Sequence, residues 1–264
     1  MMRPAAVVVT DLDGCLLDAI DYGWQPAQPA LALLREQQIP LVLNTSKTWA
    51  EVRPLQRALE IPTGTAVVVE NGGAVHLHDR QHPLGVPRET LGDWLTDHDC
   101  ARRYRFQSFT ELGVRGIARA TGLSLGAAAR AAERCWTEPL LWEDSADARE
   151  RFTAEARAAG LQVLAGGRFL HLQGPVDKGD ALPVLRAIFA VDGDDAPPIV
   201  ALGDAENDRA MLAAADVAIW VRSPRHPVPA GVPRARVSID TGPLGWNQSL
   251  QQWLQESVSA EEPR

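Results

Sequence analysis

Residues 5–17 read AAVVVTDLDGCLL, and this stretch decides the fold. Its first six residues, AAVVVT, are short, apolar and rich in β-branched valine, which is typical of a strand buried on both faces of a parallel sheet. Asp11 and Asp13 follow at the carboxyl end of that strand, and Gly14 allows a sharp turn after them. Open parallel sheets place ligands at this end of their strands. The stretch therefore predicts a buried strand that ends in a pair of functional carboxylates.

Four more runs share this apolar character: PLVLNT (40–45), AVVVE (66–70), IVALG (199–203) and VAIWV (217–221). Residues 29–38 and 48–60 have helical spacing and separate the first three strands. An order of strand, helix, strand, helix, strand predicts an α/β fold with a doubly wound parallel sheet.

The third and fourth strands are separated by about 130 residues, far more than the dozen or so that a crossover needs. We therefore expect a core of residues 1–82 and 175–264, interrupted by an α+β cap at residues 83–174. The cap has helical candidates and one predicted turn between two closing strands: helices at 91–101, 124–134 and 147–159, and the turn at Ala165-Gly166-Gly167.

The composition excludes several classes of protein. With 264 residues, 45% apolar and 23% charged, the chain has the usage of an ordinary globular protein. Its 26 basic and 34 acidic residues give a net charge of -8, which does not favour nucleic-acid binding. The three cysteines form no CxxC pair, and the first apolar run is too short for a signal peptide or a membrane span. We expect a cytoplasmic protein without a nucleic-acid or membrane partner, and its oligomeric state stays open.

Acidic side chains gather at two predicted strand ends. Asp11 and Asp13 repel each other unless a cation or a shared proton intervenes. The fourth strand ends in GDAENDRAML, which adds Asp204, Asn207 and Asp208 at the same edge. A turn explains the first pair alone, and helix capping explains any one of the others, but neither explains the whole cluster. Because oxygen ligands suit a hard cation, the cluster predicts Mg²⁺.

Two further segments favour an anionic substrate. The second strand ends in NTSKT, where Thr45 and Ser46 precede a helix; hydroxyl and N–H groups there can hold a phosphate, and helix capping by Ser46 or Thr48 is compatible with this. Lys178 in VDKGDAL begins the helix that follows the cap and offers a fixed positive charge. The alternative for a single lysine at a helix start is a solvated side chain.

In chain order, these segments resemble the four motifs of the haloacid dehalogenase (HAD) superfamily of phosphatases and phosphotransferases: DLDG, Thr45, Lys178 and GDAEND. The insert resembles the type IIB cap of that superfamily. The resemblance implies that Asp11 is the nucleophile that takes the phosphoryl group. It also implies that Asp13 is first the general acid and then the general base.

The same resemblance implies a set of metal and phosphoryl contacts. Mg²⁺ would be held by Asp11, the backbone carbonyl of Asp13, and Asp204, with support from Asp208. The phosphoryl oxygens would be contacted by Thr45, Ser46, Lys178 and Asn207. One departure is Cys15, because the superfamily usually has threonine after this glycine, and a thiol is a weaker hydrogen-bonding partner than a hydroxyl.

Other stretches resemble mannosyl-3-phosphoglycerate phosphatases: Thr45-Ser46-Lys47-Thr48, Glu70-Asn71-Gly72-Gly73, residues 109–142 and GGRFLHL (166–172). This implies hydrolysis of mannosyl-3-phosphoglycerate to mannosylglycerate, a compatible solute. Arg168 can bind the substrate carboxylate with two parallel hydrogen bonds. Lys47, Asn71 and His171 are the other candidates for substrate contacts. For Arg168 and His171, a surface arginine and a satisfied strand histidine are the alternatives.

Several alternative functions remain open from the sequence. A glucosyl-3-phosphoglycerate phosphatase differs only in the stereochemistry of the sugar, and a sugar-phosphate phosphatase of broader range has the same core motifs. A phosphomutase would return the phosphoryl group to a sugar. A catalytically silent binding protein on the same scaffold is the alternative from another class.

Overall fold

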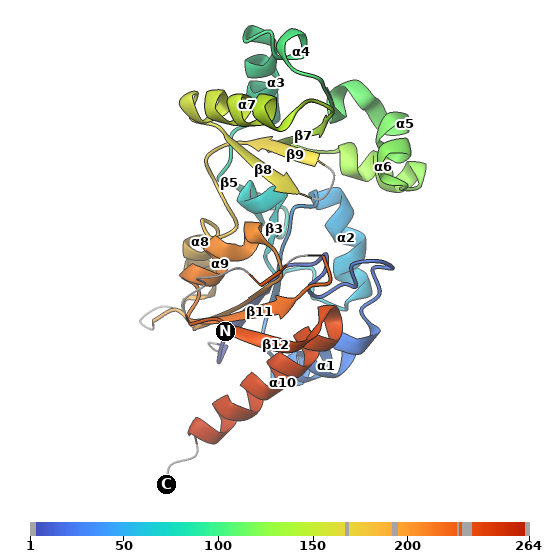
Figure 1. Ribbon diagram of the computed structural model, residues 1–264. Helices are drawn as coiled ribbons and strands as arrows, with labels where there is room; N and C mark the ends of the chain where they lie inside the picture. The colour runs from blue at the N-terminus through green and yellow to red at the C-terminus, as the bar shows by residue number, and fades with distance from the viewer. Residues whose placement is uncertain (1–3, 167–168, 192–194, 226, 229–233, 262–264) are drawn as a thin grey trace. The chain divides into compact units, whose positions relative to one another are not determined.

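The computed structural model describes residues 4–166, 169–191, 195–225, 227–228 and 234–261 (Figure 1). The chain divides into two compact units. The first unit comprises residues 1–45, 61–68 and 177–264, and the second comprises residues 46–60 and 69–176.

The first unit is built on six parallel strands: β1 (Val7–Thr10), β2 (Leu41–Asn44), β3 (Val67–Val69), β10 (Ile199–Gly203), β11 (Val217–Arg222) and β12 (Arg236–Thr241). They lie in the order β12-β11-β10-β1-β2-β3. Every residue of β1 and β10 is buried, as expected for strands covered on both faces. The predicted doubly wound α/β sheet is therefore confirmed.

The helical elements of the first unit include α1 and α10, which lie side by side in Figure 1: η1 (Gln25–Ala27), α1 (Gln28–Glu36), α8 (Leu182–Phe189), η3 (Glu206–Asp208), α9 (Arg209–Ala214) and α10 (Gly242–Glu261). Asn247 in α10 accepts a hydrogen bond of 2.9 Å from the backbone N–H of Ala30 in α1. Its neighbour Trp246 is fully buried. The C-terminal helix is thus an integral part of this core.

The second unit contains a smaller antiparallel sheet in the order β6-β7-β9-β8: β6 (Phe106–Ser108), β7 (Thr137–Trp142), β9 (Phe169–Gln173) and β8 (Gln162–Gly166). Its helices include α7, which runs along the sheet in Figure 1: α3 (Arg88–Asp97), α4 (Cys100–Arg103), α5 (Phe109–Thr121), α6 (Leu125–Ala132) and α7 (Ala146–Ala158). Phe152 of α7 packs with Leu140 and Leu172 in a buried cluster. This is an α+β arrangement, as expected for the insert.

The second unit begins earlier in the chain than residue 83. It also contains α2 (Trp49–Ala58), η2 (Glu70–Gly72) and the hairpin of β4 (Ala74–Leu77) and β5 (Arg80–Pro83). Thr48, the residue before α2, is bonded directly to a helix of this unit: its Oγ1 donates to the carbonyl of Arg130 in α6 at 2.9 Å. The compact units divide the chain at residues 45/46, 60/61, 68/69 and 176/177. The limits of a functional core and cap at residues 83 and 174 stay a prediction.

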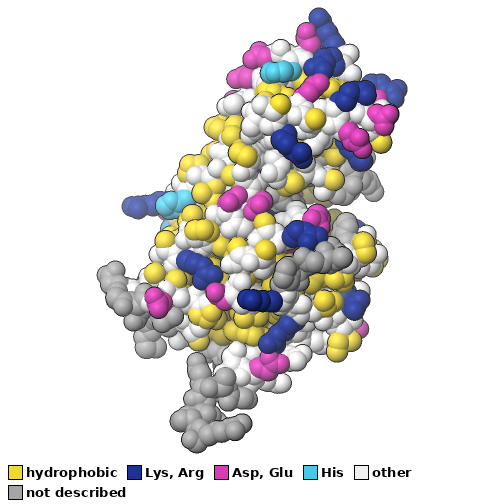
Figure 2. Space-filling model, turned by 60° about the vertical axis from the view of Figure 1, so that its left-hand side comes forward, with side chains coloured by type: hydrophobic (Ala, Val, Ile, Leu, Met, Phe, Trp, Pro, Cys, Tyr) yellow, Lys and Arg dark blue, Asp and Glu magenta, His cyan; other side chains and the backbone are white. Residues whose placement is uncertain are grey.

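Charged side chains of both signs are interspersed on the face shown in Figure 2. A continuous basic band, which a nucleic-acid backbone would require, is not seen among the described residues of that face. Within the part of the chain that the structure describes, no helix has the length and apolar character needed to cross a bilayer.

Candidate active site

From β1, the sheet extends through β2 and β3 on one side and through β10, β11 and β12 on the other. The position between β1 and β10 is therefore the topological switch point, where open α/β sheets bind ligands. Asp11 follows β1 and Asp204 follows β10. The register pairs Thr10 with Leu202, so the two aspartates leave the sheet at the same edge. The backbone N–H of Asp11 extends this pairing, donating to the carbonyl of Leu202 at 2.9 Å.

The chain turns sharply after β1, as predicted. Gly14 has a φ of 93°, and its N–H donates to the carbonyl of Leu17 at 2.8 Å. A Cβ atom at this position would lie 2.6 Å from Oδ2 of Asp204. Glycine is therefore required both by the backbone conformation and by the close approach of the β10 loop.

Lys178 has a fully buried side chain, so the solvated alternative for this lysine is wrong. Its Nζ donates to Oδ1 of Asp11 at 2.5 Å and to Oδ1 of Asp208 at 2.6 Å. The backbone carbonyl of Lys178 accepts a hydrogen bond of 2.9 Å from Nδ2 of Asn44, the last residue of β2. Segments from three distant parts of the sequence thus fix the position of the ammonium.

Asp208 organises the loop after β10 as well as the lysine. Its Oδ2 accepts hydrogen bonds from the N–H groups of Asp204 at 2.9 Å and Ala205 at 3.0 Å. A Cβ atom on Gly203 would lie only 2.4 Å from the Cβ of Asp208, so glycine is needed at the strand end. Asp208 therefore connects the lysine to the backbone that carries Asp204.

Burial has a large effect on the ionisation of this cluster. Burial raises the pKa of Asp11 to about 7; Lys178 lowers that pKa, while Asp208 and Asp13 raise it. The pKa of Asp204 is raised to about 8, mainly by burial and then by Asp11 and Asp208. Burial alone would lower the pKa of Lys178, but its two carboxylate partners raise it above the usual value. One ammonium is therefore insufficient to keep all the carboxylates charged at neutral pH.

The acidic group fits a hard divalent cation. Carboxylate oxygens of Asp11, Asp204 and Asp208 lie within 4.8 Å of one another. Oδ1 of Asp204 is buried and accepts no hydrogen bond from any described residue. A buried carboxylate oxygen without a donor is costly unless a cation neutralises it. Carboxylate oxygens are the ligand type that Mg²⁺ prefers.

The other predicted core residues lie near the same edge. Thr45 is buried directly after β2, and its N–H donates to the carbonyl of Val68 at 3.0 Å. Asn207 lies in η3 and is half-buried. Asp13, also half-buried, forms an isolated bridge with Leu17 in the turn after β1.

The remaining predicted residues belong to the second unit. The carbonyl of Ser46 accepts two hydrogen bonds of 3.2 Å from Arg134, and the carbonyl of Lys47 accepts one of 3.0 Å from the N–H of Glu70. Nδ2 of Asn71 donates to Oε1 of Gln173 at 3.4 Å. These contacts show backbone or side-chain anchoring and do not test the predicted substrate contacts.

His171 and Arg168 complete the predicted set. Nδ1 of His171, in β9, is buried without a hydrogen bond from the residues that the structure describes. Burial, and then the charge of Arg134, lowers the pKa of His171 to about 3, so the ring is neutral near pH 7. Arg168 lies outside the described residues.

Sequence reasoning missed a buried cluster around Glu70. The Glu70 carboxylate accepts hydrogen bonds from the N–H groups of Cys135 at 2.9 Å and Trp136 at 3.1 Å, and from Oγ1 of Thr137 at 2.7 Å. Arg134 lies 3.9 Å away and bonds Thr137 at 2.6 Å. The available signal was an acidic residue at the end of an apolar strand, but its partners are more than sixty residues further along the chain.

Comparison with known proteins agrees with this geometry. Residues 8–84 match the sequence model of the haloacid dehalogenase-like hydrolases. A hydrolase of that name from Bacteroides thetaiotaomicron superposes with a TM-score of 0.70 at 17% identity, covering 94% of this chain and 99% of the other. The fold is that of the HAD-like hydrolases.

Two further HAD-like structures are similar. A phosphatase of the haloalkanoate superfamily from Bacteroides thetaiotaomicron has a TM-score of 0.66 at 18% identity, covering 96% of this chain and 95% of the other. The sucrose-phosphatase of Synechocystis, solved with sucrose and phosphate, has a TM-score of 0.61 at 14% identity, covering 96% and 98%. The structural similarity therefore extends over nearly the whole chain, the second unit included.

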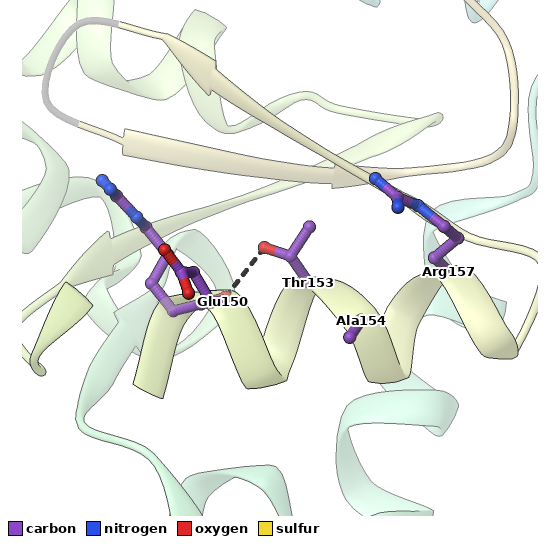
Figure 3. Close-up of a pocket in the computed structure, with 5 residues that line it drawn as sticks. Glu150, Thr153, Ala154 and Arg157 are labelled. Carbon is purple, nitrogen blue, oxygen red and sulfur yellow. Dashed lines mark hydrogen bonds between the residues drawn. The ribbon is translucent and has the colours of Figure 1, made fainter. Parts of the chain in front are cut away.

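The second unit also has a shallow groove along α7, with a volume of about 250 Å³ (Figure 3). Charged side chains at the two ends and small ones between them line it: Arg149, Glu150, Thr153, Ala154 and Arg157. The Thr153 hydroxyl donates to the carbonyl of Arg149 at 2.8 Å. None of the predicted site residues lines the groove, so it is separate from the acidic cluster.

Proposed function

We propose that this chain is a Mg²⁺-dependent phosphatase that hydrolyses a phosphate monoester through an aspartyl phosphate on Asp11. The observation that carries the proposal is the buried Lys178 ammonium, held between Asp11 at 2.5 Å and Asp208 at 2.6 Å. A fixed cation beside a carboxylate at a ligand-binding sheet edge is suited to attracting a phosphate dianion to that carboxylate.

The proposed reaction has two displacements. In the first, a carboxylate oxygen of Asp11 attacks phosphorus, the ester P–O bond breaks, and Asp13 gives its proton to the leaving oxygen. In the second, Asp13 takes a proton from water, the water oxygen attacks phosphorus, and the bond to Asp11 breaks to release phosphate. Lys178 offsets the charge on the phosphoryl group in both steps. Thr45, Ser46 and Asn207 donate hydrogen bonds to the phosphoryl oxygens.

We assign the Mg²⁺ ion to Asp11, the backbone carbonyl of Asp13, and Asp204. The support is the buried Oδ1 of Asp204 and the spacing of the carboxylate oxygens within 4.8 Å. When bound, the ion neutralises carboxylate and phosphoryl charge. Asp208 has a supporting role, because its oxygens accept hydrogen bonds from Lys178 and from the loop backbone.

As substrate we propose mannosyl-3-phosphoglycerate, with mannosylglycerate and phosphate as products. The support is the sequence resemblance in the second motif and the cap, together with the buried Nδ1 of His171, which has no hydrogen-bond partner among the described residues. A neutral imidazole can exchange hydrogen bonds with sugar hydroxyls. Lys47, Asn71 and Arg168 are the other proposed contacts, with Arg168 for the carboxylate.

A comparison of kcat/KM with Mg²⁺ on mannosyl-3-phosphoglycerate, glucosyl-3-phosphoglycerate and hexose phosphates tests the substrate. We expect the mannosyl compound to be preferred. Equal values on simple hexose phosphates would exclude this specific assignment and favour a broader sugar-phosphate phosphatase, which the likeness to a sucrose-phosphatase also supports.

Asp11→Asn tests the chemistry itself. We expect this variant to lose phosphate release while it keeps its fold, and Asp93→Asn, on the exposed face of α3, to retain full activity. If the wild-type protein releases no phosphate from any of these esters, the silent binding protein becomes the better interpretation. If Asp11→Asn remains active, Asp11 is not the nucleophile.

A further inference from the structure

The hydroxyl of Thr10, immediately before Asp11, is fully buried and has three hydrogen-bonding neighbours. Nε1 of Trp246, from α10, donates to Thr10 Oγ1 at 2.9 Å. Thr10 Oγ1 in turn lies 2.8 Å from the carbonyl oxygen of Asp11. The sulfur of Cys15 lies 3.7 Å from the same hydroxyl.

The chemistry of these groups fixes the direction of each hydrogen bond. An indole N–H can only donate, so the hydroxyl accepts from Trp246. A carbonyl can only accept, so the single hydroxyl proton points to the Asp11 oxygen. The Cys15 thiol is then left to donate to the second lone pair of the hydroxyl. The Thr10 hydroxyl thus gives one hydrogen bond and receives two, which is its full capacity.

This arrangement restrains the Asp11 backbone on both sides. Its N–H is held by the carbonyl of Leu202 at 2.9 Å, and its carbonyl is held by the Thr10 hydroxyl. The Asp11 carboxylate is separately held by Lys178. Small displacements of an attacking atom cost large factors in rate, so such restraint bears directly on the proposed attack.

The support behind Thr10 is itself well anchored. Trp246 is fully buried, and the next residue of α10, Asn247, bonds the backbone of Ala30 in α1 at 2.9 Å. The indole therefore has little freedom to withdraw its N–H from Thr10. Cys15, where the resemblance leads us to expect threonine, completes the set with a weaker donor.

We propose that Trp246 and Thr10, assisted by Cys15, are positioning residues that hold the Asp11 peptide in the geometry required for attack on phosphorus. The proposal rests on the proposed role of Asp11 as the nucleophile. It assigns a function in the active site to α10, a helix that contains none of the four motifs.

The test compares Thr10→Val, Thr10→Ser and Trp246→Phe in full-length protein, with Mg²⁺ and the best phosphate ester substrate. Thr10→Val keeps the shape but loses the hydroxyl, and we expect its kcat to fall at least about tenfold with KM changed less than about twofold. Trp246→Phe should show a smaller loss of the same kind, because the hydroxyl remains but its direction is no longer fixed. Thr10→Ser should restore kcat to within about threefold of wild type.

Trp220→Phe is the matched control. Trp220 is also buried, in β11, and its Nε1 has no hydrogen-bond partner within the described ranges. We expect this variant to keep the wild-type kcat. If Thr10→Val or Trp246→Phe keeps it as well, or if Thr10→Ser is as impaired as Thr10→Val, the proposal is overturned.

A second measurement does not depend on turnover. Beryllofluoride, added with Mg²⁺, mimics a phosphoryl group on a carboxylate, and ¹⁹F NMR reports its binding. We expect its affinity to fall in Thr10→Val and Trp246→Phe but not in Thr10→Ser or Trp220→Phe. Unchanged affinity in all four variants would refute the positioning role alone, whereas a wild-type protein that neither binds beryllofluoride nor releases phosphate would refute the proposed function and this inference together.

Discussion

The ammonium of Lys178 and the carboxylate of Asp208 form an ion pair of 2.6 Å in which both side chains are fully buried. Neither group has access to solvent that could compensate for the loss of its partner. The pair joins the turn before α8 to η3 after β10, so it contributes to the stability of the first unit.

Replacement of Lys178 by methionine is therefore expected to destabilise the protein. Because Asp11 and Asp208 are left buried without their cation, we expect the free energy of unfolding to fall by about 3–5 kcal/mol at about pH 8. The loss should be smaller at about pH 5, because Asp11, whose pKa is about 7 even beside Lys178, is then protonated. Urea denaturation followed by tryptophan fluorescence measures both values.

Arg186→Met is the control for the lysine variant, since the pair of Arg186 and Asp216 is partly exposed. Its cost should stay below about 1 kcal/mol. If Lys178→Met lowers the free energy of unfolding by an equally small amount, the buried pair does not stabilise the fold.

Mg²⁺ is expected to stabilise the folded protein, because it binds a site that the unfolded chain lacks. The midpoint of thermal unfolding should rise with Mg²⁺ and fall again with a chelator. Asp204→Asn removes the charge of a ligand, so at least about ten times more Mg²⁺ should be needed for the same rise. Differential scanning calorimetry over a Mg²⁺ series, with Asp93→Asn as control, gives the comparison; identical curves for the two variants would rule out Asp204 as a ligand.

The Glu70 cluster is expected to stabilise the start of β7. Glu70→Gln keeps the shape but turns one acceptor into a donor that faces the N–H groups of Cys135 and Trp136. We expect the free energy of unfolding of this region to fall by about 2–4 kcal/mol. The amides of residues 135–137 should then exchange hydrogen faster. Glu133→Gln, an exposed change in the same segment, should leave this exchange unaltered. If the amides of residues 135–137 exchange at the same rate in both variants, the Glu70 carboxylate does not stabilise this segment.

His171 is expected to make stability depend on pH. Its pKa is lowered to about 3 in the folded state, against about 6.5 in an unfolded chain. Below about pH 6.5 the unfolded chain therefore takes up a proton that the folded protein refuses, and stability falls with decreasing pH by up to about 1.4 kcal/mol per unit. Above that range the effect vanishes.

Hydrogen exchange of the β9 amides, corrected for intrinsic rates, measures this slope between about pH 7.5 and pH 5. His171→Gln cannot take up the proton, so its stability should decline less steeply as the pH falls. Parallel slopes for wild type and variant would mean that His171 is protonated equally well in both states.

The sequence was informative wherever burial imposed a pattern. Strands β1 and β10 are covered on both faces, so their residues form uninterrupted apolar runs that predict them directly. By contrast, β12 lies at the edge of the sheet, and Ser238 is the one buried residue among its six, so burial imposed no apolar run there and the strand was not predicted. Helix α5 was also missed, because Gly113, with a φ of 56°, interrupts its helical pattern.

The residue types and their order along the chain were enough to predict that Asp11, Asp204 and Lys178 meet at one sheet edge, because parallel strands end on the same side. Lys178, predicted to begin a helix, lies in the turn that precedes α8. Contacts between side chains distant in sequence were decided by the tertiary structure: Lys178 between two carboxylates, Glu70 against residues 135–137, and Trp246 behind Thr10. Local pattern determines how each element forms and which face it buries. The choice of hydrogen-bond partner inside the core depends on packing and on the exclusion of water, and these arise only when the chain is folded.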